Sequence, residues 1–409
     1  MEILFIGVAC TEDAIEESNR KYYDTPQIRP QQYFDLALTK GLAKHCNVLT
    51  LTLPPVGSYP KSSCWIYNRK SEKPILQLEI SYITLINLPI IKNIIIMITT
   101  FFRTLVFLIE NRKKNPVVLC GYISFQTAFP ALLAARITKK NIFTIVPDAP
   151  KFIPTYTKIN NLLKIAISNF FIYINRKIEI KFDGYVFLTH QMNELINQNQ
   201  KPYIVVEGMV QVDDYFFEDK KGKSYPKVVM YAGTLHEKFG IWKLVEAFIA
   251  SNLQDCELWI YGNGDIVKKI EKISEENSNI KYKGNASKSH IFEMERKATL
   301  LVNPRPSTEE FTKYSFPSKT LEYMVSGTPL LTTRLSGIPK DYDRYLYYFT
   351  EESVIEMAEM LKIVMFKSKK ELDDFGSKSR EFVINNKNNN IQAEKIFKFM
   401  KKKMSTREQ

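Results

Sequence analysis

Short apolar runs alternate with segments of helical periodicity along most of the chain. Runs of this kind are typical of strands that are buried on both faces of a parallel sheet, with helices covering those faces. The runs are residues 3–6, 48–53, 117–120, 141–146, 182–189 and 202–206 in the first half, and residues 228–233, 257–264, 280–284, 300–303 and 330–333 in the second. The alternation predicts an α/β protein in which each half is a doubly wound, Rossmann-like parallel-sheet domain.

The length of 409 residues also predicts two domains, because it exceeds what one compact core usually accommodates. A polar stretch of mixed charge, residues 208–225, would link them. We therefore expect residues 1–207 to form the first domain and residues 208–385 the second. The lysine-rich residues 386–409 predict a basic C-terminal helix that could return to the first domain.

The first predicted strand is followed by a polar stretch, residues 9–32, which contains Pro26 and Pro30. This composition predicts a long loop, and loops of this length at the end of a strand are often functional. Helical periodicity resumes at residues 33–44.

Composition narrows the class of protein only in part. The chain is 45% hydrophobic and 25% charged, as in folded proteins and unlike disordered ones. Its five cysteines form no CxxC pair and it has four histidines, so we expect reduced thiols in a cytoplasmic protein and no metal site. Residues 1–7 lack a basic flank and a cleavage site, which indicates a strand and not a signal peptide. The formal net charge of +13 favours nucleic acid, anionic lipid or phosphorylated ligands without choosing among them.

Two apolar segments carry basic residues. In residues 88–109, Lys92 and Arg103 interrupt an apolar run whose uncharged centre is shorter than the roughly 20 residues that span a bilayer. This segment is either a core helix or a helix that partly rests on lipid. Residues 158–181 mix aromatic and aliphatic side chains with lysines, which suits either an anionic membrane surface or a core helix with solvated lysines. The lipid alternatives predict a peripheral location at the inner face of the cell membrane.

Residues 314–327 predict a short helix with clear ends. Ser315 suits the N-cap, and Pro317 suits the first turn because its missing N–H would be unpaired there. Gly327 can adopt the left-handed conformation that ends a helix.

Helical spacing places Ser318, Lys319 and Glu322 on one face of this helix, near its N-terminal end. A hydroxyl, an ammonium, a carboxylate and free backbone N–H groups together suit a phosphate and sugar hydroxyls. The alternative is an ordinary amphipathic helix with an exposed ion pair.

Glycines follow two predicted strands of the second half, at Gly233 and at Gly262. Such glycines let the backbone approach a nucleotide closely. Neither a G-x-G-x-x-G nor a G-x-x-x-x-G-K-[ST] sequence occurs, so neither an NAD enzyme nor a P-loop ATPase is supported. In the first half, Asp148 follows the run 141–146, at the edge where open parallel sheets bind ligands. It is either a general base or the cap of a turn.

A set of motifs in the second half occurs in a characteristic order and spacing. The motifs are Tyr231-Ala-Gly-Thr-Leu235, Lys238-Phe-Gly-Ile241 with Glu246-Ala-Phe248, Trp259-Ile-Tyr-Gly-Asn-Gly264, Leu301-Val-Asn-Pro-Arg305, and Ser315-Phe-Pro-Ser-Lys319 through Glu322-Tyr-Met324. This set resembles the retaining, GT-B-fold glycosyltransferases of family 4, especially bacterial members that build surface polysaccharides. The resemblance covers most of residues 228–340, whereas the first half resembles the family only in its strand–helix rhythm.

The resemblance implies the GT-B fold, in which two Rossmann-like domains face a cleft, and an EC 2.4-type transferase of hexosyl or related groups that retains configuration. The second domain would bind a UDP- or GDP-linked sugar. The first would bind the acceptor, a growing lipid-linked saccharide of capsule or lipopolysaccharide synthesis, or a glycolipid. No cofactor or metal is expected, because positive side chains and backbone N–H groups can stabilise the leaving diphosphate.

The resemblance also assigns residues. Glu322 matches the family's glutamate that accepts hydrogen bonds from ribose hydroxyls. The glutamate expected eight residues earlier is Tyr314 here, and Glu310 is a nearby carboxylate that could reach the donor sugar instead. Asp148 would orient or deprotonate the acceptor hydroxyl, so Asp148 and Glu310 are the expected catalytic residues. The expected donor-binding residues are Gly233, Thr234, Lys238, Gly262, Asn263, Ser315, Phe316, Ser318, Lys319 and Glu322.

Other functions are open at this point. A non-catalytic nucleotide-sugar or polysaccharide-binding protein of the same fold would explain Tyr314 as a mark of lost activity. A nucleic-acid-binding protein would fit the net charge, but no platform of aromatic and lysine residues is recognisable, so no nucleic-acid partner is expected. A nucleotide-sugar epimerase of the GT-B fold matches the site residues less well.

Overall fold

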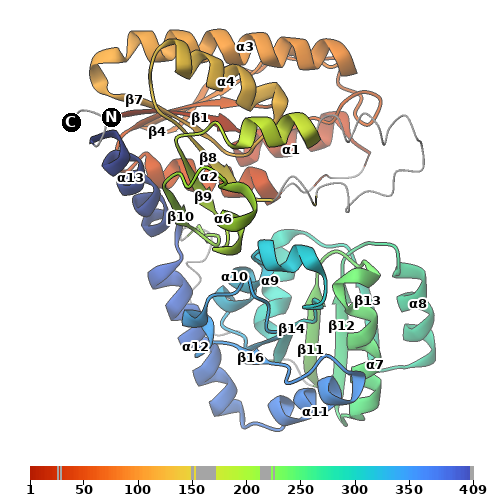
Figure 1. Ribbon diagram of the computed structural model, residues 1–409. Coiled ribbons are helices and arrows are strands. Elements are labelled where there is room, and N and C mark those ends of the chain that lie inside the picture. The colour runs from red at the N-terminus through yellow and green to blue at the C-terminus, as the bar shows by residue number, and fades with distance from the viewer. Residues whose placement is uncertain are drawn as a thin grey trace. The chain divides into compact units, whose positions relative to one another are not determined.

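The computed structural model describes residues 1–24, 27, 30–148, 152, 172–211, 223 and 226–405. The chain divides into two compact units, Met1–Met209 with Asn389–Gln409, and Val210–Asn388. Each unit is a largely parallel sheet with helices on both faces (Figure 1). The first part of the predicted helix 158–181 and most of the predicted linker 208–225 lie outside the described residues.

The described part of the first unit holds an eight-stranded sheet with the order β10-β9-β8-β7-β1-β2-β5-β4. All neighbouring strands are parallel except β4 and β5. The strands are β1 (Glu2–Gly7), β2 (Asn47–Thr52), β4 (Glu72–Ile75), β5 (Leu78–Tyr82), β7 (Pro116–Cys120), β8 (Ile142–Val146), β9 (Gly184–Phe187) and β10 (Tyr203–Val205), with β3 (Ile66–Tyr67) and β6 (Leu85–Ile86) as a separate antiparallel pair. The six runs predicted for this half are confirmed. Because the chain proceeds outward from β1 through β2 on one side and through β7 on the other, the topological switch point lies between β1 and β7.

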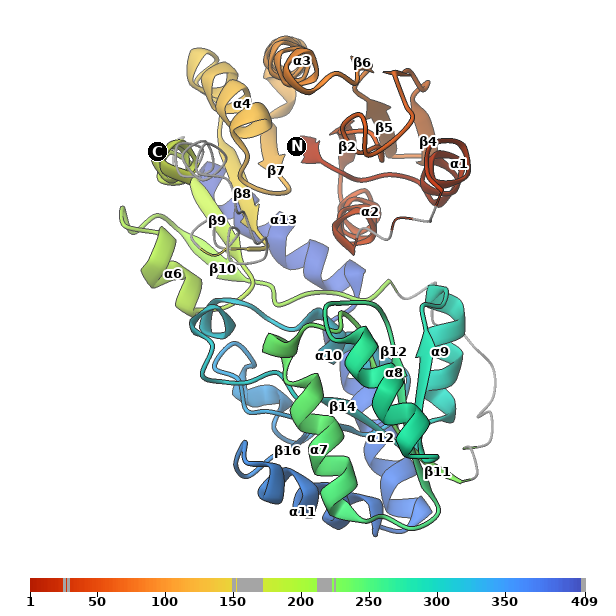
Figure 2. The same cartoon turned by 90° about the vertical axis from the view of Figure 1, so that its right-hand side faces the viewer.

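Helices cover both faces of this sheet (Figure 2). On one face lie α3 (Pro89–Glu110) and α4 (Phe125–Ile137), which pack against each other. On the other lie α2 (Pro30–Leu42) and α13 (Asn389–Ser405), the last helix of the chain. The Asn389 side chain donates a hydrogen bond to the Ala37 carbonyl oxygen at 3.2 Å, which joins α13 to α2. The short α6 (Gln191–Ile196) precedes β10.

The prediction of a loop over residues 9–32 is wrong for much of its length, because α1 (Glu12–Tyr22) lies there. The hydroxyl of Thr11 caps this helix by accepting a hydrogen bond from the Ala14 N–H at 3.2 Å. Only a narrow face that includes Ala14 and Ile15 is buried, so the apolar periodicity was too sparse to predict a helix. Strand β5 was also not predicted, because its sequence alternates apolar and polar residues and contains no continuous apolar run.

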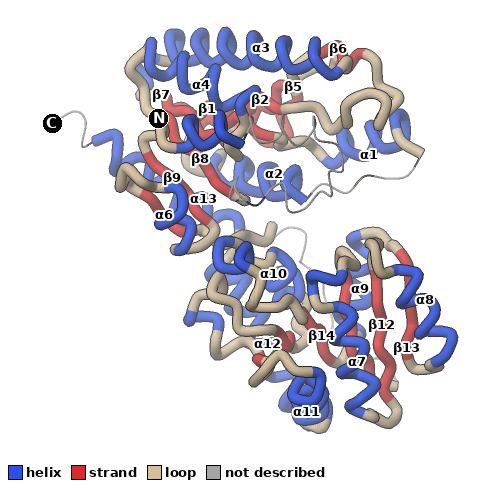
Figure 3. The backbone as a smooth tube through the Cα atoms, turned by 45° about the vertical axis from the view of Figure 1, so that its right-hand side comes forward, coloured by secondary structure: helices blue, strands red, loops and turns tan. Residues whose placement is uncertain are grey.

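The described part of the second unit has six strands, all parallel, in the order β13-β12-β11-β14-β15-β16. Figure 3 shows β12 beside β13 in this sheet. The strands are β11 (Lys227–Ala232), β12 (Cys256–Tyr261), β13 (Ile280–Gly284), β14 (Leu300–Asn303), β15 (Leu330–Thr332) and β16 (Tyr347–Tyr348). This is the strand order 3-2-1-4-5-6 of dinucleotide-binding Rossmann domains. Its switch point lies between β11 and β14, and the predicted fold class is confirmed.

Helices again cover both faces (Figures 1 and 2). One face carries α7 (Ile241–Ser251), α8 (Val267–Glu276) and α11 (Val354–Met365), and the other carries α9 (Lys288–Lys297), α10 (Ser318–Val325) and α12 (Lys369–Asn386). The core lies between the sheet and α7 with α11, and it contains fully buried aliphatic residues such as Val229, Leu244, Leu258, Val302 and Leu361.

The predicted start of the helix at Ser315 is wrong, since α10 begins at Ser318 and Pro317 is its N-cap. A residue before proline is disfavoured in the helical region, so Phe316 cannot continue a helix toward Pro317. Ser315 is extended instead, with φ −129° and ψ 140°. The predicted end is confirmed, because Gly327 follows the helix with φ +77°.

Loops at the carboxyl edge of the second sheet meet at glycines. Gly262, after β12, has φ +131°, and a Cβ built on it would lie 1.7 Å from the carbonyl oxygen of Gly233, after β11. At Gly240, before α7, a Cβ would lie 2.1 Å from the carbonyl oxygen of Pro304, after β14. These loops can therefore touch only because no side chain separates them.

Replacing Gly262 with alanine should lower the free energy of unfolding of the second unit by roughly 3 kcal/mol or more, because the methyl group collides with a carbonyl oxygen at an already unfavourable φ. The matched control is Gly284→Ala, where φ is +69° and no atom lies within 4 Å of the new Cβ. That change should cost about 1–2 kcal/mol, the cost of the backbone conformation alone. Urea unfolding measures both losses, and equal losses would contradict the argument.

Candidate functional site

The side chain of Lys319 lies directly against Gly233 at the switch point of the second sheet. A Cβ built on Gly233 would lie 2.3 Å from Cε of Lys319 and 3.0 Å from its Nζ. Lys319 is the second residue of α10 and is half-buried. The missing side chain at position 233 thus allows an ammonium group to reach the edge where Rossmann domains bind phosphates.

Two further cations lie around one aromatic pair at the same edge. Nζ of Lys238 lies 5.5 Å from the ring centroid of Phe239 and 6.0 Å from that of Phe311, while the guanidinium carbon of Arg305 lies 4.9 Å and 5.5 Å from the same centroids. Such distances are those of cation–π contacts. Lys238 and Arg305 are therefore neighbours, although one follows β11 and the other follows β14.

Tyr231 connects the two groups of contacts. Its hydroxyl donates a hydrogen bond to the Thr234 carbonyl oxygen at 3.1 Å and lies beside Gly233. Burial raises the pKa of the Tyr231 hydroxyl, and the Arg305 guanidinium opposes this rise, so Arg305 is within electrostatic reach of Tyr231. We call Lys238, Arg305 and Lys319 the cationic edge.

Sequence reasoning missed Arg305 as a site residue. It ends the motif Leu301–Arg305, directly after β14, and an arginine that follows a strand at a switch point was the available signal. The contact of Arg305 with Phe239 could not be predicted, because the two residues are far apart in sequence.

Glu322 of α10 lies beside a second carboxyl group, that of Glu295 in α9. Glu322 is half-buried, whereas Glu295 is 3% exposed. Burial and the charge of Glu322 hold the pKa of Glu295 well above its ordinary range, while Lys319 and Lys288 oppose the rise. Glu295 therefore holds its proton more tightly than an ordinary glutamate, and Glu322, Glu295 and Lys319 form one electrostatic group.

The segment that directly precedes α10 places its side chains differently. The ring of Phe316 is 6% exposed and packs against the ring of Tyr342, with centroids 5.6 Å apart, so this side chain fills the core. The hydroxyl of Ser315 is buried without a hydrogen-bond partner among the described residues. Ser318 is exposed at the first position of α10.

Glu310 and Tyr314 begin and end the 3₁₀ helix η5 (Glu310–Tyr314). Glu310 is exposed and Tyr314 is half-buried. A 3₁₀ helix has three residues per turn, so residues four positions apart face different directions. Glu310 therefore lies on a different face of η5 from position 314. It could replace a carboxylate at position 314 only by reaching the donor sugar from that other face.

An open depression lies beyond Gly262 in the second unit. It has a volume of about 670 Å³, and the rings of Tyr261 and His290 border it with centroids 6.0 Å apart. Lys283 lies over the ring of Trp259 at 5.2 Å in the same depression. Exposed Asn263 adjoins it in sequence and accepts a hydrogen bond from the Gly264 N–H through its own side chain. No sequence motif marks His290 as a site residue.

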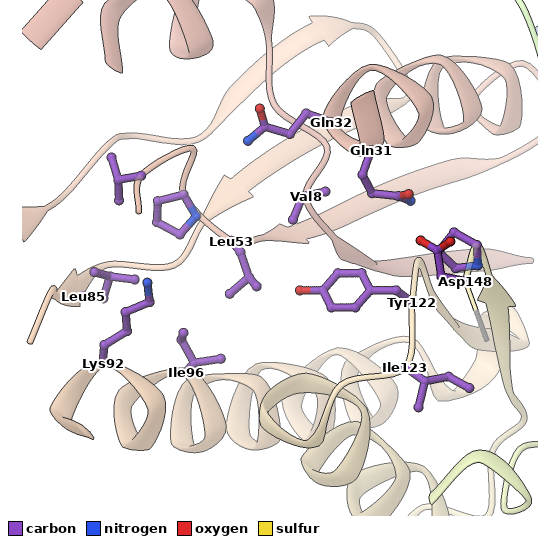
Figure 4. Close-up of a pocket in the computed structure, with 13 residues that line it drawn as sticks. Val8, Gln31, Gln32, Leu53, Leu85, Lys92, Ile96, Tyr122, Ile123 and Asp148 are labelled. Atoms are coloured by element: carbon purple, nitrogen blue, oxygen red, sulfur yellow. The ribbon is translucent and has the colours of Figure 1, made fainter. Parts of the chain in front are cut away.

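A cavity of about 420 Å³ lies in the first unit, and Asp148 lines it (Figure 4). Several of its lining residues follow β1, β2, β7 or β8, so it lies outside the carboxyl ends of strands on both sides of the switch point. The polar lining residues are Gln31, Gln32, Lys92, Tyr122 and Asp148, and the apolar ones include Val8, Leu53, Val56, Leu85, Ile96 and Ile123. Of these, sequence reasoning selected Asp148 alone as a functional residue.

The structure brings some of the sequence-predicted residues together in the second unit and places one in the cavity of the first. Gly233, Thr234, Gly262 and Lys319 lie together, with Lys238 linked to them through Arg305 and Tyr231, while Asp148 belongs to the cavity of the first unit. Among the residues that the structure describes, no group of three or more histidine, cysteine, aspartate or glutamate side chains could hold a metal ion.

Residues 226–365 match a family model described as glycosyl transferases group 1. None of the curated proteins is similar enough in sequence to match the chain. Among solved structures, sucrose-phosphate synthase from Thermosynechococcus elongatus is similar with a TM-score of 0.65 and 11% identity, over 99% of this chain and 100% of that one.

Two further solved structures are similar over nearly the whole chain. HepE from Anabaena, in complex with UDP, has a TM-score of 0.60 and 10% identity, and the match covers 98% of this chain and 100% of that one. The lipopolysaccharide outer core galactosyltransferase WaaB has a TM-score of 0.59 and 15% identity, with the same coverage. At these identities the likeness shows the fold, and the family match lies within the unit that carries the cationic edge. The chain has the fold of these structures, the GT-B fold, and residues 226–365 match the group 1 glycosyl transferases.

Proposed function

We propose that this enzyme transfers a hexosyl or related group, with retention of configuration, from a UDP- or GDP-sugar to a lipid-linked saccharide or glycolipid. The observation that carries the proposal is the contact of Lys319 with Gly233 at the switch point, beside Arg305 and Lys238. A set of cations there suits the diphosphate of a nucleotide-sugar.

The cationic edge would act on the leaving group. When the bond between the anomeric carbon and the phosphate oxygen breaks, negative charge develops on the diphosphate, and fixed positive groups stabilise it most in that state. The acceptor oxygen would form its bond to the anomeric carbon on the face that the diphosphate leaves, and the hydroxyl proton would pass either to a phosphate oxygen or to the carboxylate of Asp148. No metal ion or other cofactor is part of this proposal.

Further residues would orient the donor. Glu322 would accept hydrogen bonds from the ribose hydroxyls, and the depression bordered by Tyr261 and His290 would receive the base. That the similar HepE structure holds UDP supports a nucleotide donor. Glu310 would contact the donor sugar in place of a carboxylate at position 314. Asp148 would orient or deprotonate the acceptor hydroxyl.

A membrane surface would present the lipid-linked acceptor, and an apolar face of the first unit suits it. Of the described helices, α3 is long and apolar enough to cross a membrane by length and composition, and it packs on the sheet and on α4. Large apolar side chains are exposed along the two helices. They are Ile90, Ile91, Ile94, Ile98, Phe102, Val106 and Ile109 of α3 and Phe129, Leu133 and Ile137 of α4. We call this surface the α3–α4 face.

Basic residues surround one end of the α3–α4 face. They are Arg112, Lys113, Lys114, Arg136 and Lys139, all of them exposed. Lys140 donates a hydrogen bond to the Arg112 carbonyl oxygen at 3.3 Å, which joins the ends of the two helices. An apolar face beside clustered cations suits the interface of an anionic bilayer. We therefore propose a cytoplasmic enzyme that binds the inner face of the cell membrane.

Replacing Lys319 with alanine should weaken UDP binding by about tenfold to a hundredfold, because a charge-assisted hydrogen bond to phosphate contributes about 1.5–3 kcal/mol. Isothermal titration of the full chain with UDP and GDP measures the effect. The control is Lys313→Ala, which removes the same charge from an exposed position of η5.

Absence of UDP and GDP binding to the wild type, or an equal effect of both lysine variants, would contradict the donor site. Binding of the nucleotide without transfer from any sugar nucleotide to lipid-linked acceptors would instead favour the non-catalytic alternative, which Tyr314 suggests.

Replacing Phe102, which is 57% exposed on α3, with glutamate should reduce co-sedimentation with vesicles that contain anionic phospholipid, because a charge would enter the apolar interface. Phe366, which is 78% exposed after α11 in the second unit, provides the matched control. Phe366→Glu should sediment like the wild type. If the wild-type protein does not co-sediment with anionic vesicles, membrane binding by this face is contradicted.

A further inference from the structure

One side of the cavity of the first unit is polar, and its residues have no role in the proposed reaction. Its residues are Gln31, Gln32 and Asp35, from the first turns of α2. Gln31 and Gln32 line the cavity, and Asp35 lies beneath them, fully buried. Figure 4 shows both glutamines across the cavity from Lys92 and Ile96 of α3.

Asp35 fixes two parts of the cavity wall. Its Oδ2 accepts a hydrogen bond from the Val8 N–H at 2.8 Å, and its Oδ1 accepts one from the Gln31 side chain at 2.7 Å. Val8 and Gln31 both line the cavity. Asp35 therefore determines where the loop after β1 and the amide of Gln31 lie.

Glycines make room for this carboxyl group at the ends of both central strands. A Cβ built on Gly7, the last residue of β1, would lie 2.5 Å from Oδ2 of Asp35, and one built on Gly121, after β7, would lie 3.0 Å from it. Burying a carboxyl group without a charged partner is costly, and both hydrogen-bond donors to Asp35 are neutral. Burial raises the pKa of Asp35 to about 7.

Gln32 is buried in the wall of the cavity with an incomplete set of hydrogen bonds. Its side chain is 2% exposed, and its amide nitrogen lies 3.8 Å from the sulfur of Cys10. Its Oε1 has no hydrogen-bond partner within the described parts of the chain. A buried amide oxygen without a donor is destabilising, which points to a ligand that supplies the donor.

The rest of the wall indicates the chemistry of that ligand. Leu53, Val56 and Ile96 provide apolar surface. Tyr122 adds an aromatic ring near Leu53 and Ile96 (Figure 4). A sugar ring presents C–H groups that pack on such surfaces and hydroxyl or amide N–H groups that donate hydrogen bonds. The volume of about 420 Å³ is in the range of small-molecule sites.

We propose that Gln32 is a specificity-determining residue that accepts a hydrogen bond from a hydroxyl or amide N–H of the acceptor's sugar unit, and that Asp35 is the positioning residue that holds Gln31 and Val8 around that sugar. The assignment of the sugar as the acceptor rests on the proposed function. The binding of a sugar in this cavity can be measured separately.

Replacing Gln32 with leucine removes the amide and keeps a side chain of similar size. Methyl α-glucoside, methyl α-galactoside and N-acetylglucosamine serve as probes, and saturation-transfer NMR on the full chain measures their binding. We expect at least one probe to bind the wild type and to bind Gln32→Leu about tenfold more weakly, as the loss of one hydrogen bond requires. The variant should unfold at the same or a higher urea concentration, because it loses an unpaired polar group.

UDP binding is measured on the same samples. It distinguishes failure of the proposed sugar site from failure of the proposed donor site. If UDP binds but no probe binds the wild type, or if Gln32→Leu binds the probes as the wild type does, this inference is overturned while the donor site stands. If the probes behave as expected but UDP does not bind, the proposed transferase function fails and the sugar site stands.

Asp35→Asn tests the positioning residue through pH. Unfolded chains lose the Asp35 proton near the ordinary pKa of 3.8, whereas the folded protein keeps it up to about pH 7. The folded state thus binds more protons in this window, and wild-type stability should fall, relative to that of Asp35→Asn, as pH rises from about 4 to 7. The difference should become constant above that range.

Probe binding should follow the same titration if Asp35 positions the cavity. Tyr122 from the β7–α4 loop, Asp148 after β8, Lys92 from α3 and Cys10 after β1 are the other titratable groups around this cavity. Burial and the Asp35 charge raise the pKa of Tyr122 above its ordinary value of 10.0, so it does not titrate in this window. Wild-type affinity should change near pH 7 and that of Asp35→Asn should not. Identical binding profiles would overturn the role of Asp35.

Discussion

Both candidate sites depend on glycines at the ends of the central strands, because the missing side chains there let a charged group from a helix lie against the backbone. In the second unit, Gly233 leaves room for the side chain of Lys319. In the first unit, Gly7 and Gly121 leave room for the carboxyl group of Asp35. Each charged group comes from a helix and reaches the switch point of its own sheet, where any side chain on these glycines would occupy its place.

The side chains that lie against these glycines are of opposite type, a basic one in the second unit and an acidic one in the first. Lys319 is half-buried and joins Arg305 and Lys238, so the second unit presents positive charge at the edge of its sheet. Asp35 is fully buried, and burial raises its pKa to about 7, so the carboxyl group beneath the largely apolar cavity of the first unit keeps its proton until the pH approaches 7. A diphosphate fits the first arrangement and an uncharged sugar ring fits the second, as a transfer from a nucleotide-sugar to a saccharide would require.

The sequence predicted the strands, and it selected Lys319 and Gly233, which lie against each other in the structure. It did not predict the cavity of the first unit. Lys319 and Gly233 belong to short motifs beside strands, so their spacing carries information. Asp35 lies among the apolar residues of an ordinary helical pattern, and periodicity does not reveal that a carboxyl group is buried. The glycines that end β1 and β7 were the one local sign of it. The error at Ser315 was avoidable, because Pro317 already disfavours a helical residue at position 316.

The helix α3 shows why hydropathy alone left two alternatives open. Its few polar residues, among them Lys92, Thr100 and Arg103, recur on one side of the helix, but hydropathy does not say whether that side faces solvent or the protein. In the structure Ile96, Phe107 and Leu108 are buried, while Ile94 and Phe102 are more than half exposed. Packing on the sheet thus accounts for one side of the helix only. Exposed apolar area that continues onto α4 is unfavourable in water, and the membrane contact that we propose would cover it.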